Sequence, residues 1–175
     1  MRESSEKLNN QAIRFAQRGE YFDAIACLKR AITVENSNFL LWFNLGITYR
    51  DAGDFKNAKD SMIRSNKLNP YDEEVIEALA NLCISQRNFQ EAIYYCLNGL
   101  EVNNMNPHFW NTLGVIYFTL SDYGEASELF EHAVYLNPYY YDAVFNLRDT
   151  YEELGNKVGA EECERILKTL NKDGI

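Results

Sequence analysis

The side chains best suited to nucleophilic, acid–base or metal chemistry in this sequence are two histidines and four cysteines. His108 and His132 lie 24 residues apart, and the cysteines are Cys27, Cys83, Cys96 and Cys163, with no Cys-x-x-Cys pair. No Ser-His-acid or Cys-His arrangement indicates a catalytic nucleophile, and the nine glycines occur singly rather than in a phosphate-binding loop. We therefore expect no enzymatic activity, no metal and no cofactor, and four buried thiols in a reducing compartment.

The charge of the chain disfavours two classes of partner. With 17 basic and 26 acidic residues, the formal net charge is −9. Nucleic acid and anionic membrane surfaces would be repelled, so neither is expected as a partner. No apolar run is long enough to span a membrane and no signal peptide begins at Met1, which together favour a cytoplasmic location.

The elements that would hold these side chains follow a 34-residue period. A motif of Trp-x2-Leu-Gly-x2-Tyr begins at Trp42 and again at Trp110, 68 residues later, and a weaker copy lies half-way between them. Each strong copy is followed by alanine, a large apolar residue and proline, at Ala58, Met62, Pro70 and at Ala126, Phe130, Pro138. A repeated unit of this length indicates a stack of similar modules.

Each 34-residue unit reads as two helices. Apolar residues recur at i, i+3, i+4 and i+7 in both halves, which is the period of an amphipathic helix. Turn-forming residues separate the halves, at Gly19, Gly53, Asn88, Asp122 and Gly155. Gly46 and Gly114 are expected to face Ala58 and Ala126, because larger side chains would push the two helices apart.

This frame resembles the tetratricopeptide repeat (TPR) family, whose signature is W-x2-L-G-x2-Y, A-x3-F and P at a period of 34. The resemblance covers nearly all of the chain. It implies an all-α fold, an α-solenoid of about five tandem TPR helical hairpins in a right-handed superhelix, forming a single domain over residues 1–175. The repeats would occupy residues 5–38, 39–72, 73–106 and 107–140, followed by a degenerate capping copy at 141–174. The last helix is expected at 157–172, with one apolar stripe and a polar outer face.

The resemblance also implies a binding surface. In this family the first helices of successive hairpins line a concave groove, and carrying its positions over gives Asn10, Ile13, Leu40, Phe43, Asn44, Ile47, Asn81, Ile84, Asn111, Val115, Phe118, Phe145 and Asn146. The apolar members are expected to be exposed there. Asn10, Asn44 and Asn146 share a position at which similar proteins hydrogen-bond a peptide backbone, although Ala78 and Thr112 interrupt that series.

The resemblance implies a non-catalytic interaction module that binds a peptide or helix of a partner protein in the groove. Acidic residues such as Glu74 and Asp142 flank the apolar positions, which favours an apolar ligand with basic flanks. An acidic C-terminus is not expected as the ligand, because Glu74 has the wrong sign for such a clamp. Two alternatives remain open. One is a scaffold that forms a homo-oligomer through its ends or through the tyrosine run 139–141, and the other is an accessory domain of a larger protein.

Overall fold

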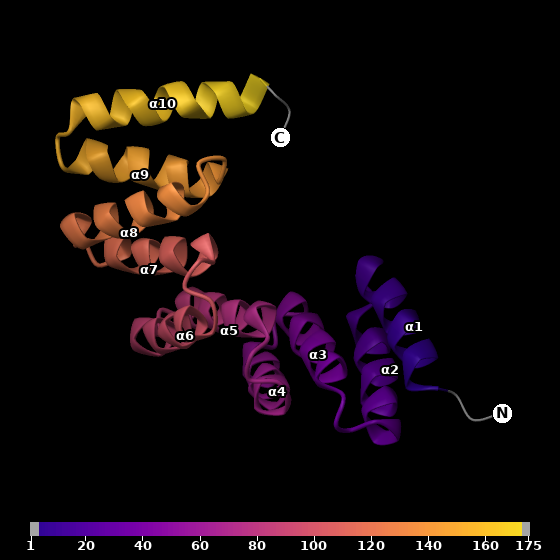
Figure 1. Cartoon of the computed structure of the whole chain (residues 1–175). Helices are drawn as coiled ribbons and strands as arrows, with labels where there is room; N and C mark the ends of the chain where they lie inside the picture. Colours follow the sequence, from indigo (N-terminus) through magenta and orange to yellow (C-terminus); the bar gives the residue numbers. More distant parts are fainter. Residues whose placement is uncertain (1–3, 173–175) are drawn as a thin grey trace. The chain divides into compact units, whose positions relative to one another are not determined.

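The computed structural model describes residues 4–172, and within that range it contains ten α-helices and no strand (Figure 1). Helices α1 and α2, α3 and α4, α7 and α8, and α9 and α10 pack as hairpins, so the predicted all-α fold of tandem TPR-like hairpins is confirmed. By the contacts within the chain, the molecule divides into two compact units, Met1–Gln86 and Arg87–Ile175.

Unit 1 contains five helices. They are α1 (Ser5–Gln17), α2 (Tyr21–Val34), α3 (Phe39–Asp51), α4 (Phe55–Leu68) and α5 (Glu73–Ser85). Helix α1 packs against α2 and α3 against α4, while α2 contacts α3, α4 contacts α5, and α1 also touches α3. The first helices of two successive hairpins, α1 and α3, are therefore neighbours.

Unit 2 also contains two hairpins, and its single helix precedes them. Its helices are α6 (Phe89–Val102), α7 (Pro107–Thr119), α8 (Tyr123–Leu136), α9 (Tyr141–Glu153) and α10 (Lys157–Lys172). Helix α7 packs against α8 and α9 against α10, with further contacts of α6 with α7, α8 with α9, and α7 with α9. Helix α10 has the bounds that the sequence predicts for the capping helix, and it buries the expected apolar stripe through Cys163, Leu167 and Leu170.

The first helices of the repeats begin at a regular spacing because their capping residues recur with the same period. The first helices begin at Ser5, Phe39, Glu73, Pro107 and Tyr141, 34 residues apart. Ser4, Asn38, Asp72 and Asn106 precede four of them, and each side chain accepts a hydrogen bond from a backbone N–H of the first turn. Pro107 stands in the first turn of α7, where its missing N–H costs no hydrogen bond.

Each of the two motif tryptophans donates a hydrogen bond to the loop that precedes its helix. The indole Nε1–H of Trp42 donates to the carbonyl of Asn36 at 2.8 Å, and that of Trp110 donates to the carbonyl of Asn104 at 2.9 Å. Both tryptophans are half-buried, and a loop carbonyl gives the N–H of each ring a hydrogen-bond acceptor. The two strong copies of the motif thus fix the entry of the chain into α3 and α7.

The small residue of each motif is needed where two helices cross. A Cβ atom at Gly114 would lie 2.5 Å from Cε1 of Phe130, and one at Gly46 would lie 2.6 Å from Cγ of Met62. The sequence predicted a small residue here but placed it opposite alanine. For both glycines the nearest neighbour is the large apolar side chain four residues after that alanine, and at Gly46 the carbonyl oxygen of Ala58 also lies 3.1 Å from the added Cβ atom.

Three of the five predicted turns contain a glycine with positive φ, Gly19, Gly53 and Gly155. In the other two hairpins the same register position holds Arg87, with φ of 57°, and Ser121, with φ of 64°. The predicted turn residues Asn88 and Asp122 come one residue later and cap the next helix. Residues with a Cβ atom rarely adopt this left-handed conformation, so these two turns are strained.

Relieving one of these turns should stabilise the protein. We expect Ser121→Gly to raise the free energy of unfolding by about 0.5–1 kcal/mol, because the left-handed penalty of a non-glycine residue exceeds the entropy that glycine adds to the unfolded chain. Gly155→Ala, at the same position of the next hairpin, should lower it by about 1 kcal/mol. Urea unfolding followed by circular dichroism measures both, and a destabilised Ser121→Gly variant would contradict the strain assigned to this turn.

Candidate functional site

A pair of asparagines joins the first helices of successive hairpins in each unit. In unit 1 the Nδ2 amide of Asn44 on α3 donates to Oδ1 of Asn9 on α1 at 2.8 Å. In unit 2 the Nδ2 amide of Asn146 on α9 donates to Oδ1 of Asn111 on α7 at 3.0 Å. Both bonds are partly buried, so the same polar link is built twice.

The link fixes how Asn44 and Asn146 can face a ligand. Each has given one N–H to its partner, which orients the carboxamide and leaves its Oδ1 as an acceptor. In unit 2 the link extends further, because Nδ2 of Asn111 donates to the hydroxyl of Tyr140 at 3.4 Å. Asn44 and Asn146 were both predicted to contact a peptide ligand. That binding role stays a prediction.

Beside each asparagine pair lies a pocket. The pocket of unit 1 has a volume of about 250 Å³ and is lined by Ile13, Ala16, Gln17, Leu28, Asn44, Ile47, Thr48 and Asp51. The pocket of unit 2 has a volume of about 80 Å³ and is lined by Val115, Phe118, Phe130, Asn146 and Asp149. In both pockets most of the lining comes from first helices, and one residue comes from a second helix, Leu28 of α2 or Phe130 of α8.

The two pockets are the same site in two hairpin pairs. Adding 102 residues, three periods, to five residues of the unit 1 pocket gives the five residues that line the unit 2 pocket. Three of these pairs are conservative: Ile13 with Val115, Leu28 with Phe130, and Asn44 with Asn146. The other two change the chemistry, since Ala16 becomes Phe118 and Ile47 becomes Asp149. The sequence analysis missed the second-helix residues that complete each pocket, and this 102-residue comparison could have found them.

The other predicted groove residues differ in exposure. Ile13, Leu40 and Phe145 are exposed by 40, 49 and 37%. Asn81 is also exposed, Asn111 is buried in the amide link, and four apolar residues are half-buried: Ile47, Ile84, Val115 and Phe118. The structure therefore brings Ile13, Asn44 and Ile47 together in one pocket and Val115, Phe118 and Asn146 in the other.

The expected exposure of Phe43 is wrong, because this side chain is only 6% exposed. It stands in the register position of Asn9 and Asn111, and Ala78, one repeat later, stands in the position of Asn44 and Asn146. An aromatic ring and a small residue thus replace the two amides. Helix α3 also packs against α1, α2 and α4, so it buries more than a single stripe.

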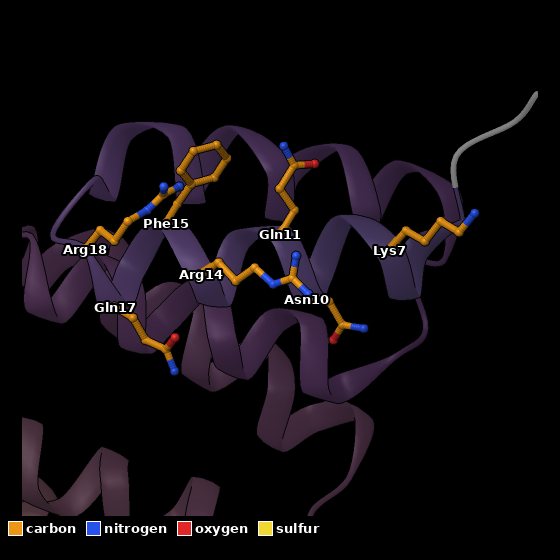
Figure 2. Close-up of a pocket in the computed structure, with 7 residues that line it drawn as sticks. All are labelled: Lys7, Asn10, Gln11, Arg14, Phe15, Gln17 and Arg18. Atoms are coloured by element: carbon orange, nitrogen blue, oxygen red, sulfur yellow. The ribbon is translucent and has the colours of Figure 1, made fainter.

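Asn10 lies apart from the asparagine links. Figure 2 shows it on α1 beside a broad hollow of about 790 Å³, which is lined by residues of that helix and by Arg18 at its C-terminal end: Lys7, Asn10, Gln11, Arg14, Phe15, Gln17 and Arg18. Arg18 pairs with Glu20 at 3.3 Å. Asn44 donates its hydrogen bond to Asn9, the residue before Asn10. Asn10 therefore does not form a ladder with Asn44.

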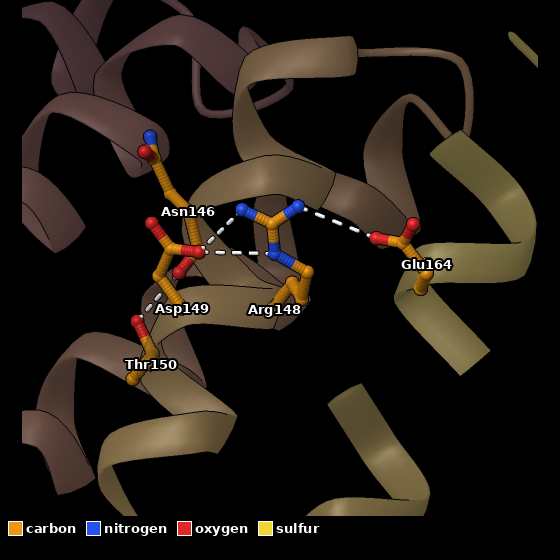
Figure 3. A network of polar contacts seen from close by, with 5 residues as sticks. All are labelled: Asn146, Arg148, Asp149, Thr150 and Glu164. Carbon is orange, nitrogen blue, oxygen red and sulfur yellow. Dashed lines mark hydrogen bonds and ion pairs between the residues drawn. The ribbon is translucent and has the colours of Figure 1, made fainter. Parts of the chain in front are cut away.

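An ion pair replaces the glycine–apolar contact in the last hairpin. Arg148 occupies the register position of Gly114, and Glu164 occupies that of Phe130. The guanidinium donates to Oε2 of Glu164 at 3.3 Å and to Oδ1 of Asp149 at 2.6 Å through Nη2 and 3.0 Å through Nε (Figure 3). The hydrogen bonds from Arg148 to Asp149 raise the pKa of the guanidinium. Its carbon Cζ also lies 4.2 Å from the ring centre of Phe145.

All four cysteines are buried, and burial raises the pKa of the Cys163 thiol, which disfavours the nucleophilic thiolate. Over residues 4–172 no group of three or more histidine, cysteine or acidic side chains could hold a metal ion. No helix within the same range is long and apolar enough to cross a membrane.

The hydroxyl of Tyr151 donates to Oε1 of Glu131 at 2.8 Å, and burial together with this bond raises the pKa of Tyr151. An unfolded tyrosine ionises near pH 10, so the unfolded state loses this proton first as the pH rises. We expect stability to fall as the pH goes from about 9 to about 11, and less steeply in Tyr151→Phe. Urea unfolding midpoints across that range measure the difference, and parallel curves for the two proteins would contradict it.

Comparison with known proteins identifies the family. A profile described as "TPR repeat" matches residues 14–53, and one described as "Tetratricopeptide repeat" matches residues 40–72 and 107–140. Together they cover more than half of the chain. The chain belongs to the tetratricopeptide repeat family. The uncharacterized protein ycf37 of Pyropia yezoensis is 32% identical to this TPR chain over 143 residues, which are 77% of this chain and 78% of that protein.

Solved structures share the fold of this TPR chain at low sequence identity. The crystal structure of MamA has a TM-score of 0.81 and 20% identity, covering 93% of this chain and 95% of that one. YrrB, described as a TPR protein with an unusual peptide-binding site, has a TM-score of 0.71 and 19% identity, covering 97% of this chain and 88% of its own. These likenesses establish the all-helical TPR architecture.

Proposed function

We propose that this TPR chain is a non-catalytic module that binds a segment of a protein partner along the first helices of its hairpins. The observation that carries the proposal is the pocket that recurs after 102 residues, with an oriented asparagine at its edge in both units. A solvent-facing polar group beside an apolar hollow is a common arrangement for ligand recognition.

The chemistry of the two sites suits a peptide. The free Oδ1 of Asn44 or Asn146 can accept a hydrogen bond from a backbone N–H, and the pocket beside it can take one apolar side chain. Ile13 on α1 is exposed and lines the unit 1 pocket, and Phe145 on α9 is exposed and directly precedes Asn146. The likeness to YrrB, with its described peptide-binding site, supports the same class of ligand.

Site-specific photo-cross-linking tests the proposal in both units. Benzoylphenylalanine would replace Ile13, which lines the unit 1 pocket, or Phe145, which directly precedes Asn146. As matched controls it would replace Phe22 on α2 or Val158 on α10, which are 86 and 76% exposed. Each protein would be irradiated in a lysate of the source organism, and cross-linked products would be identified by mass spectrometry.

We expect positions 13 and 145 to capture the same partner protein and positions 22 and 158 to capture none of it. Capture of that partner from positions 22 and 158 alone would contradict the proposal and place binding on another face. If the only product at positions 13 and 145 were a second copy of the chain, the self-assembling scaffold would replace the peptide-binding module.

A further inference from the structure

We infer that the two pockets select different side chains: the unit 2 pocket takes a lysine or arginine side chain of the partner segment, and the unit 1 pocket takes an aliphatic one. This inference rests on the proposed function and goes beyond it by stating the chemistry of the ligand. It begins with the one register position at which an apolar residue is exchanged for an acidic one, Ile47 in unit 1 and Asp149 in unit 2.

The polar atoms of the unit 2 pocket are available as acceptors. Both hydrogen bonds from Arg148 to Asp149 end on Oδ1, and within residues 4–172 the other carboxylate oxygen, Oδ2, accepts no hydrogen bond. Asn146 has donated one amide hydrogen to Asn111 and keeps its Oδ1. An ammonium or guanidinium group supplies donors with a positive charge, which matches a carboxylate and an amide oxygen.

The remaining walls also suit a cation on an aliphatic stem. Val115, Phe118 and Phe130 line the pocket, and aromatic rings attract cations while accepting the methylene groups of a lysine or arginine. Arg148 shows this chemistry nearby, with its guanidinium 4.2 Å from the ring centre of Phe145. The small volume, about 80 Å³, admits the end of one side chain rather than a helix.

The charge of unit 2 favours the same ligand. Residues 87–175 contain 14 acidic and 6 basic residues, whereas residues 1–86 contain 12 acidic and 11 basic residues. From Asn88 to Leu147 the sequence has no lysine or arginine and seven acidic residues. A positively charged segment is therefore drawn to unit 2 in preference to unit 1.

The unit 1 pocket has Ile47 in the register position of Asp149, and its own carboxylate, Asp51, lies one turn further along α3. Ile13, Leu28 and Ile47 line it, and the carboxylate of Asp51 accepts hydrogen bonds from Arg50 at 2.9 and 3.0 Å. A cation placed against Ile13 and Ile47 would lose water while the nearest carboxylate of the pocket, Asp51, stays one helical turn away from Ile47. An aliphatic side chain gains from burial at the same place.

Exchanging Ile47 and Asp149 between the two pockets tests this inference. Asp149→Ile gives the unit 2 pocket the residue of unit 1, and Ile47→Asp makes the reverse change. A phage-displayed library of random 12-residue peptides would be selected on the intact wild-type chain and on each variant. Glu153→Gln, which removes one negative charge from the exposed end of α9, is the control, and Asp149→Asn replaces Asp149→Ile if circular dichroism shows the latter unfolded.

We expect one lysine or arginine position in the peptides enriched on the wild type and on Glu153→Gln, and at least a tenfold loss of affinity for these peptides in the Asp149 variant. Ile47→Asp should add a second such position. A basic position that persists unchanged in the Asp149 variant, an equal loss in Glu153→Gln, or the absence of any enriched sequence would each overturn the inference. The photo-cross-links would still decide the proposed function, since they do not depend on the ligand's charge.

Discussion

Gly114→Ala should lower the free energy of unfolding of the protein by about 2 kcal/mol, although alanine is the better helix former. The added Cβ atom would lie 2.5 Å from Cε1 and 2.7 Å from Cδ1 of Phe130, and that ring is 1% exposed. A buried ring cannot rotate away without disturbing the apolar cluster that it forms with Val144, Leu147, Cys163 and Leu167. Urea unfolding followed by circular dichroism measures the loss.

Two further variants separate overpacking from a general intolerance of alanine. Gly124→Ala on α8 has a single neighbour, 3.9 Å away, and should stabilise the protein by about 0.5–1 kcal/mol. The double variant Gly114→Ala with Phe130→Leu recreates the pair Ala12 and Leu28 of the first hairpin. It should be at least about 1 kcal/mol more stable than the sum of the two single changes predicts. Strict additivity would show that the Cβ atom and the ring do not conflict.

Leu167→Ala should destabilise unit 2 by about 2–3 kcal/mol, because it removes a side chain that is 3% exposed from the same cluster. The expected cost lies at the lower end of the range for buried leucine. Helix α10 packs mainly against α9 and has solvent on its outer side, so it can shift to fill part of the cavity. Thermal and urea unfolding of the variant give the value.

Lys168→Ala is the matched control for Leu167→Ala. Its side chain is 68% exposed and pairs with Glu164 at 3.5 Å, so the change should stay within about 0.5 kcal/mol. The Leu167→Ala protein should also aggregate on heating, because loosening α10 exposes the apolar residues beneath it. Equal stability of the two variants would mean that α10 does not cap an apolar core.

The helical hairpins could be predicted from the sequence because the residues that define them act locally. Glycine and proline positions, the capping residues and the apolar spacing of one helix are readable without knowing its neighbours, and α10 has the predicted bounds, 157–172. The turns at Arg87 and Ser121 were harder to predict, because neither residue type signals a positive φ. Only their register with Gly19, Gly53 and Gly155 marks them.

The site was less predictable because its contacts join residues one repeat apart. Asn44 could have pointed to a ligand or to another amide, and only the packing of α1 against α3 shows that it donates to Asn9. Phe43 occupies a position that was predicted to be exposed in the groove, but its side chain is buried. Arg148 and Glu164 were recognisable as departures from the repeat, whereas their ion pair and its link to Asp149 depend on the tertiary structure.

The central claim is that the recurring pockets beside Asn44 and Asn146 bind the partner segment. The most direct measurement is a titration of the isotopically labelled chain with a selected peptide or the cross-linked partner segment, followed through the side-chain amide resonances of these two asparagines by NMR. We expect both resonances to shift in a saturable manner, with those of the exposed Asn57 and Asn156 unchanged. Saturable binding that leaves the amides of Asn44 and Asn146 unmoved would contradict the claim.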